Sequence, residues 1–205
     1  MLFRSADDGK VPRAILLSGG GNDIAGTEFG MFLNHVKSGL PAINDKVAEG
    51  VMDERLRFAT AYLVATVTRL SEQLFAKKIP VLIHGYGYPV PDGRGYLGGF
   101  WFLPGPWLKP GFAEKGFFED DTAAELATCR DLMKDMIDRF NAVQRSIAGT
   151  AGFEHVTFVD LRPLLSNALP AAYKKSWENE LHPTEEGFDA VAGEFARVLG
   201  GLPFV

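Results

Sequence analysis

The sequence predicts an α/β domain built around a parallel β-sheet. Three short apolar runs alternate with two long stretches of helical periodicity, and a third such stretch follows near the end. The expected strands are Ala14–Leu17, Pro80–His84 and His155–Leu161, and the expected helices are 52–75, 122–147 and 184–199. This alternation is typical of an α/β domain. With no linker, repeat or low-complexity stretch, we expect one domain over residues 1–205.

The first expected strand is apolar on both faces and ends in a run of glycines, which indicates a buried strand of a parallel sheet. In the helix that follows, apolar residues recur in steps of three and four. That stripe comprises Met52, Leu56, Ala59, Leu63, Val67, Leu70 and Leu74. Lys77 and Lys78 follow it, where cations suit the negative end of the helix dipole.

The second long helix has a start signal, because Thr122 and Glu125 have the spacing of a capping box. Its inward stripe is expected to include Leu126, Cys129, Met133, Met136, Phe140, Val143 and Ile147. The last helix is expected to turn Phe188, Val191, Phe195 and Val198 inward and to stop at Gly200–Gly201.

Residues 85–118 form a long Gly- and Pro-rich segment that holds ten aromatic side chains, Tyr86 among them. Loops longer than about 15 residues in compact domains are commonly lids or binding loops. Since so aromatic a segment is not typical of disorder, we expect it to form an apolar ligand pocket. The alternative is a small secondary core beneath a long loop.

Composition excludes several classes of protein. Cys129 is the only cysteine, so no disulfide forms within the chain. A net charge of −5 argues against general nucleic-acid binding. No apolar run reaches the roughly 18 residues that a membrane span needs, and the first residues do not resemble a signal peptide. Without such a signal, a cytoplasmic location is the default expectation.

The run Ser18–Asp23 follows the first expected strand directly. It lacks the residues of a phosphate-binding loop or a dinucleotide fingerprint. Taken alone, it is equally consistent with a tight turn. The functional interpretation places the Asn22 amide at the carboxyl end of a strand, where α/β sheets bind ligands and where an amide suits an oxyanion.

A second motif, Trp177–Thr184, precedes the last helix. Pro183 favours an extended backbone for His182, which leaves its ring outside the helix as a candidate base. The alternative is an ordinary capping contact. His84 ends the second expected strand and is interpreted as a structural histidine, and no spacing resembles a pair of metal ligands. We therefore expect neither a metal nor a cofactor.

Taken together, the two motifs resemble those of the SGNH hydrolases, the GDSL-type lipases and esterases. Residues 20–23 resemble that family's Gly-x-Asn-Asp block, and residues 179–183 resemble its Asp-x-x-His block. The resemblance runs from about residue 13 to 200. It implies a three-layer, flavodoxin-like fold with a short parallel sheet, and hydrolysis of a small carboxylic ester through an acyl-enzyme.

The resemblance also implies roles for particular residues. His182 would be the general base and then the general acid, Asn22 an oxyanion donor and Asn179 the residue that orients His182. Gly21, Asp23, Ser18 and Tyr86 would contact the substrate. The chain departs from the family in having Asn179 where Asp is usual, since an amide does not offset the charge of an imidazolium. Glu178 and Glu180 are nearby carboxylates, but neither has the spacing to replace that Asp.

The blocks that supply the family's nucleophilic serine and second oxyanion donor have no counterpart here. Too few residues precede the first strand for a βαβ unit of about 30, so the chain resembles the family from its third strand onward. Ser18 is the nearest resident serine. The first strand, residues 13–17, is then expected at an open sheet edge. That edge predicts self-association, a partner chain or a truncated gene product, and an inactive domain that binds acyl or glycan ligands is the alternative function.

Overall fold

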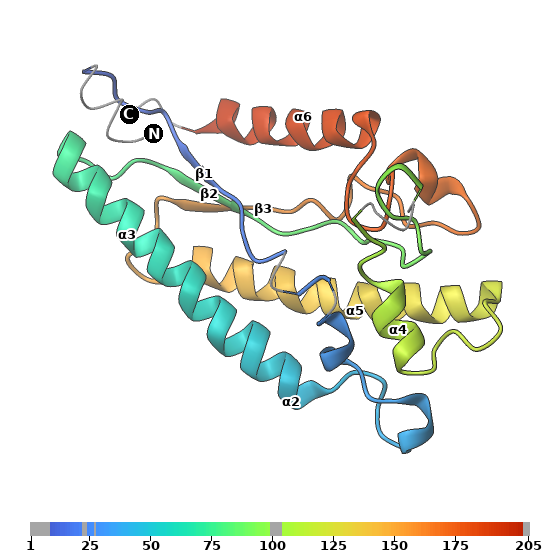
Figure 1. Cartoon of the computed structure of the whole chain (residues 1–205). Coiled ribbons are helices and arrows are strands. Elements are labelled where there is room, and N and C mark those ends of the chain that lie inside the picture. The colour runs from blue at the N-terminus through green and yellow to red at the C-terminus, as the bar shows by residue number, and fades with distance from the viewer. Residues whose placement is uncertain (1–8, 22–23, 27, 99–103, 203–205) are drawn as a thin grey trace.

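The computed structural model describes residues 9–21, 24–26, 28–98 and 104–202, which form three layers (Figure 1). A parallel three-stranded sheet is the middle layer. Helices α3 (Arg57–Phe75) and α5 (Ala123–Ala148) cover one face, and α6 (Glu185–Gly201) covers the other. The expected α/β architecture with a short parallel sheet is confirmed. Assignment to the flavodoxin-like SGNH type stays a prediction.

The sheet consists of β1 (Ile15–Leu17), β2 (Val81–His84) and β3 (Val156–Val159), in that spatial order. Leu17 is paired with Ile83, and Ile83 is paired with Phe158. Because β1 has only one neighbour among the described strands, it lies at the sheet edge, as predicted. The expectation that it is buried on both faces is wrong: Leu16 is 51% exposed, since α6 packs over Leu82 of β2 and Val159 of β3.

The first long helix starts earlier than predicted. It runs continuously from α2 (Asp45–Ala48) through a π-helical stretch, η3 (Glu49–Leu56), into α3. A π-helix has more residues per turn than an α-helix, so the buried stripe shifts by one residue after η3. Leu63, predicted to face the core, is 46% exposed, while Val64 is fully buried.

The start signals of the later helices are confirmed. Thr122 and Glu125 form the predicted capping box of α5. Thr184 caps α6, because its hydroxyl accepts a hydrogen bond from the Gly187 N–H. Phe188, however, is 54% exposed rather than inward. The remaining elements are short: η1 (Phe29–Phe32), η2 (Val36–Ser38), η4 (Tyr96–Gly98), α4 (Lys109–Glu114) and η5 (Ala172–Lys175).

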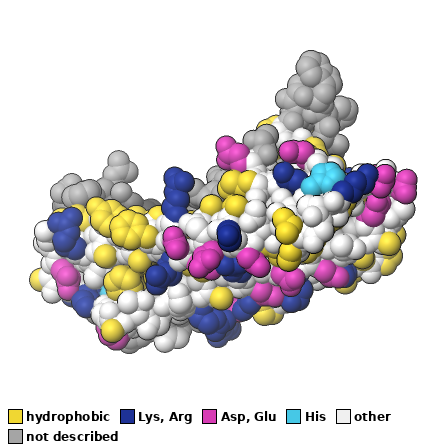
Figure 2. Space-filling view, turned by 90° about the horizontal axis from the view of Figure 1, so that it is seen from below, with side chains coloured by type: hydrophobic (Ala, Val, Ile, Leu, Met, Phe, Trp, Pro, Cys, Tyr) yellow, Lys and Arg dark blue, Asp and Glu magenta, His cyan; other side chains and the backbone are white. Residues whose placement is uncertain are grey.

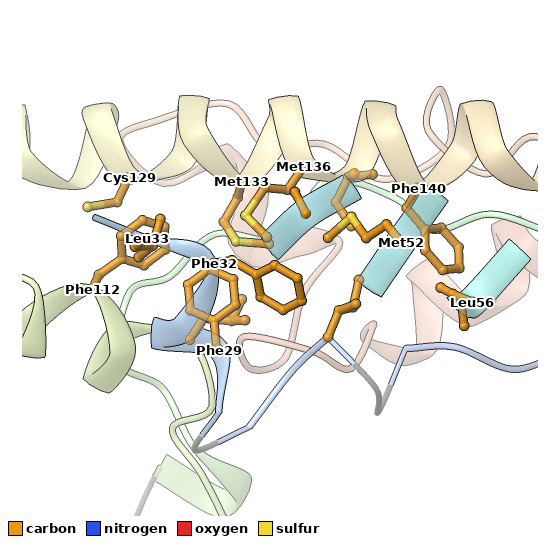
Figure 3. Close-up of a cluster of buried hydrophobic side chains, with 14 residues drawn as sticks. Phe29, Phe32, Leu33, Met52, Leu56, Phe112, Cys129, Met133, Met136 and Phe140 are labelled. Atoms are coloured by element: carbon orange, nitrogen blue, oxygen red, sulfur yellow. The ribbon is translucent and has the colours of Figure 1, made fainter. Parts of the chain in front are cut away.

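The largest core cluster lies under α5, toward the carboxyl ends of the strands. Figure 3 shows side chains of α5 pointing toward aromatic residues of η1 and α4. From α5 come Cys129, Met133, Met136 and Phe140, all buried as predicted, and opposite them lie Phe29, Phe32 and Phe112. Burial raises the pKa of the Cys129 thiol to about 12.

The surface seen from the α3 and α5 side mixes basic and acidic side chains (Figure 2). Several of them form ion pairs, such as Arg139 Nη2 with Asp53 Oδ2 at 2.6 Å. No helix within the described part of the chain is both long enough and apolar enough to cross a membrane.

Candidate active site

A cavity of about 380 Å³ lies at the carboxyl ends of the strands, between α5 and α6. This is the position at which open α/β sheets bind ligands. Its walls are mostly apolar, with Met133, Met136 and Ile137 from α5 and Val191 and Phe195 from α6. Four polar side chains also line it: Ser18, His84, Tyr86 and His182.

His182 is held by Asn179 in a defined tautomer. Asn179 Oδ1 accepts hydrogen bonds from the backbone N–H groups of Leu181 and His182, at 3.0 and 2.9 Å. The same oxygen lies 2.9 Å from His182 Nδ1. Because an amide oxygen only accepts, Nδ1 carries the proton and Nε2 is the basic nitrogen. Asn179 is 2% exposed and thus rigid, while His182 is exposed at the rim of the cavity.

The backbone around His182 is also fixed. The His182 carbonyl accepts a 3.0 Å hydrogen bond from the Glu178 N–H, and Trp177 forms an antiparallel bridge with Pro183. The Trp107 ring contacts the His182 ring edge-on, with centroids 5.3 Å apart. His182 therefore precedes α6 with its ring outside the helix, as the sequence predicts.

Glu180 has a structural role that the sequence did not reveal. It is fully buried, and its carboxylate accepts hydrogen bonds from the backbone N–H groups of Gly93, Trp107, Leu108 and Lys109, at 2.6 to 3.0 Å. Burial raises the pKa of this carboxyl, and the four N–H donors act in the opposite direction. All four donors suit the ionised form. Through these hydrogen bonds, Glu180 connects the aromatic segment at residues 93 and 107–109 to the loop that carries His182.

Part of the aromatic segment lines the cavity, and another part packs in the main core rather than in a secondary one. Tyr86, Gly87, Pro89 and Leu108 line the cavity. Phe112, Phe117 and Phe118 instead pack in the main core. Three further aromatic residues of this set, at positions 100–102, lie outside the described residues.

Tyr86 forms hydrogen bonds with the glycine run that follows β1, residues 19–21. The Gly21 N–H donates to Tyr86 Oη at 3.2 Å, and the Tyr86 hydroxyl donates to the Gly19 carbonyl at 3.3 Å. A Cβ atom on Gly21 would lie 2.8 Å from Tyr86 Oη, so a side chain there requires a shift. Asn22 and Asp23 lie outside the described residues, and their implied roles remain predictions.

His84, which is interpreted from sequence as a structural histidine at a strand end, also lines the cavity. Its Nδ1 lies 2.6 Å from the Gly85 carbonyl, so Nδ1 carries the proton and Nε2 is the basic nitrogen. Rings of Tyr86 and Phe195 pack edge-on against it. Burial lowers the pKa of His84, and its hydrogen bond to Gly85 opposes that shift. The imidazole is accordingly neutral near pH 7.

Among the described residues, no cluster of His, Cys, Asp and Glu has the arrangement of a metal site. Asp160, which follows β3, is bound by arginines: its carboxylate accepts hydrogen bonds from Arg162 and Arg145. Comparison with known proteins gave no match to any family model, curated protein or solved structure. Functional assignment therefore rests on the geometry of the cavity and on the sequence motifs.

Proposed function

We propose that this protein hydrolyses small carboxylic esters through an acyl-enzyme, in the manner of the SGNH hydrolases. The observation that carries the proposal is the oriented imidazole of His182 at the rim of a mostly apolar cavity. A base with a fixed tautomer next to an apolar pocket suits an ester whose acyl or alcohol part is apolar.

In this proposal a serine oxygen bonds to the ester carbonyl carbon as its proton passes to a neighbouring imidazole. The bond to the alcohol oxygen then breaks, the alcohol takes that proton, and an acyl-serine remains. Water then attacks the acyl carbon, His182 Nε2 takes the proton of that water, and the proton returns to the serine oxygen as the acid is released. Asn22 would donate a hydrogen bond to the oxyanion. Asn179 orients the His182 ring.

Asn179 limits the rate expected of this mechanism. A carboxylate at that position would stabilise the imidazolium that forms during proton transfer, and a neutral amide does so less well. Asn179→Asp adds the missing charge without altering the shape of the side chain. We therefore expect this variant to hydrolyse esters faster than the parent protein.

The second candidate function is binding without catalysis. It is favoured by the amide at position 179, which stabilises an imidazolium less well than a carboxylate does. In that case the apolar cavity would hold a small acyl or glycan ligand, or the site would be completed by a partner chain along the edge strand β1.

Hydrolysis of p-nitrophenyl acetate, butyrate and octanoate, measured with the parent protein and the His182→Gln variant, tests the proposal. We expect turnover by the parent and a loss on the order of 100-fold in the variant, as for removal of a general base. His35→Gln is the matched control, since His35 lies in an exposed turn and only caps η2. Absence of turnover in a folded parent protein would favour the binding function.

A further inference from the structure

We infer that Ser18 is the nucleophile of the proposed hydrolase and that His84 accepts its proton. The inference rests on the proposed function and adds two assignments that the family resemblance does not supply. The nucleophile has no counterpart in that resemblance, and His84 was interpreted from sequence as a structural residue.

The strand register brings the two residues together. Leu17 of β1 is paired with Ile83 of β2 in parallel; Ser18 follows β1 directly, and His84 is the last residue of β2. Neighbouring strands lie about 4.8 Å apart, and paired residues of parallel strands point to the same face. Ser18 and His84 are therefore side by side at the carboxyl end of the sheet.

The shared face is the one that α6 covers. Ile15 and Leu17 pack with the α3 and α5 side of the sheet, as do Val81 and Ile83. By alternation, Ser18 and His84 point to the opposite face, where Phe195 of α6 contacts the His84 ring. Both residues line the cavity described above.

His84 also has the form that a base requires. Its Nδ1–H is occupied by the Gly85 carbonyl, and within the described residues no hydrogen bond engages Nε2. Two aromatic rings fix the orientation of the imidazole. Ser18 is exposed, so an ester in the cavity can reach its hydroxyl.

In the first half-reaction, Ser18 supplies the attacking oxygen and His84 carries the proton from Ser18 to the leaving alcohol. Ser18 Oγ bonds to the ester carbonyl carbon as its proton passes to His84 Nε2. The tetrahedral intermediate collapses with cleavage of the bond to the alcohol oxygen, which takes the proton from His84. The second half-reaction, in which water releases the acid, is left to His182 as proposed above.

Covalent labelling with a fluorophosphonate reports on the first half-reaction alone. We expect one adduct, mapped by mass spectrometry to Ser18 and lost in Ser18→Ala. The labelling rate should fall on the order of 100-fold in His84→Gln, and by less than about twofold in the control His35→Gln. An adduct on another serine, or labelling that depends on His182 and not on His84, would overturn the inference. Ester turnover that persists in Ser18→Ala would overturn it as well, while leaving the hydrolase function intact.

A thiol in place of Ser18 gives a test that needs no ester turnover. In Ser18→Cys we expect iodoacetamide to alkylate the introduced thiol readily at pH 7, because a neighbouring imidazole promotes the thiolate. Adding His84→Gln should slow this alkylation at least tenfold. The parent protein is the control, since its buried Cys129, with a pKa of about 12, should stay unmodified while the chain is folded. Equal alkylation rates with and without His84, in variants that keep their circular dichroism spectrum, would refute the pairing.

Discussion

Replacement of Glu180 by alanine is expected to destabilise the protein more than any surface substitution near the cavity. The change removes one buried carboxylate and leaves four backbone N–H groups without their acceptor. An unsatisfied buried donor costs about 1–3 kcal/mol. Leu108 N is in a buried residue, whereas the other three donors belong to half-buried residues that water can reach. We therefore expect a loss of about 3–5 kcal/mol.

Glu180→Gln separates charge from shape. The amide keeps one acceptor oxygen but turns an NH2 group toward two of the N–H donors, so we expect a loss of about 2 kcal/mol. Glu178→Ala is the matched control on the same loop. Its side chain is exposed, and a change within about 0.5 kcal/mol is expected.

Urea unfolding followed by far-UV circular dichroism gives these free energies, provided that the slope with urea stays constant across the variants. The backbone N–H of Trp107 donates a hydrogen bond to Glu180, and the ring of Trp107 contacts the ring of His182. Tryptophan fluorescence in a Trp107→Phe variant, compared with that of the parent, isolates the Trp107 signal and reports on whether the cavity rim rearranges. A Glu180→Ala protein within 1 kcal/mol of the parent would show that the four hydrogen bonds are replaced by water and that our reasoning is wrong.

Three other perturbations test separate parts of the structure. Phe140→Ala, in the fully buried core, should cost about 3–5 kcal/mol in a urea titration, and a loss below 1 kcal/mol would contradict the described packing. Hydrogen bonds from the Thr122 and Glu119 N–H groups lower the pKa of Glu125 to about 2. Ionised Glu125 therefore stabilises the folded protein fully above the pKa of about 4.3 that it has in the unfolded chain. This stabilisation is lost as the pH falls toward 2. The difference in melting temperature between the parent and Glu125→Gln should shrink over that pH range. If the edge strand pairs with a second copy, Leu16→Lys should lower the sedimentation coefficient to that of a monomer, whereas an unchanged value would exclude pairing at this edge.

Much of the fold was predictable because periodicity and capping act locally. The capping box of Thr122 and Glu125 and the inward stripe of α5 depend on residues a few positions apart, and both are confirmed. The stripe of α3 was misplaced by one residue because the sequence carries no clear sign of the π-helical stretch before it. The prediction that Leu16 is buried is wrong because an apolar run does not tell how many helices cover a strand.

The candidate site was predictable only in part, for a similar reason. The contact between His182 and Asn179 spans three residues and lies in the segment that resembles the family's Asp-x-x-His block, so the resemblance implied it. The hydrogen bonds of Glu180 to Trp107 and Leu108 span more than 70 positions, and no local pattern encodes them. Ser18 and His84 become neighbours only through the register of two strands that a long helix separates in sequence.

The position of β1 has a consequence for the dynamics of the cavity. This strand has three residue pairs with β2 and no second strand beside it among the described residues, and Arg13 at its start is tied to the Leu199 carbonyl near the end of α6. Elements with so few hydrogen bonds open locally at a lower free energy than the centre of a fold. Amide hydrogens of β1 should therefore exchange with solvent sooner than those of β2. Each opening would carry Ser18 away from His84, so the fraction of molecules with an intact pair would follow the local stability of one short strand.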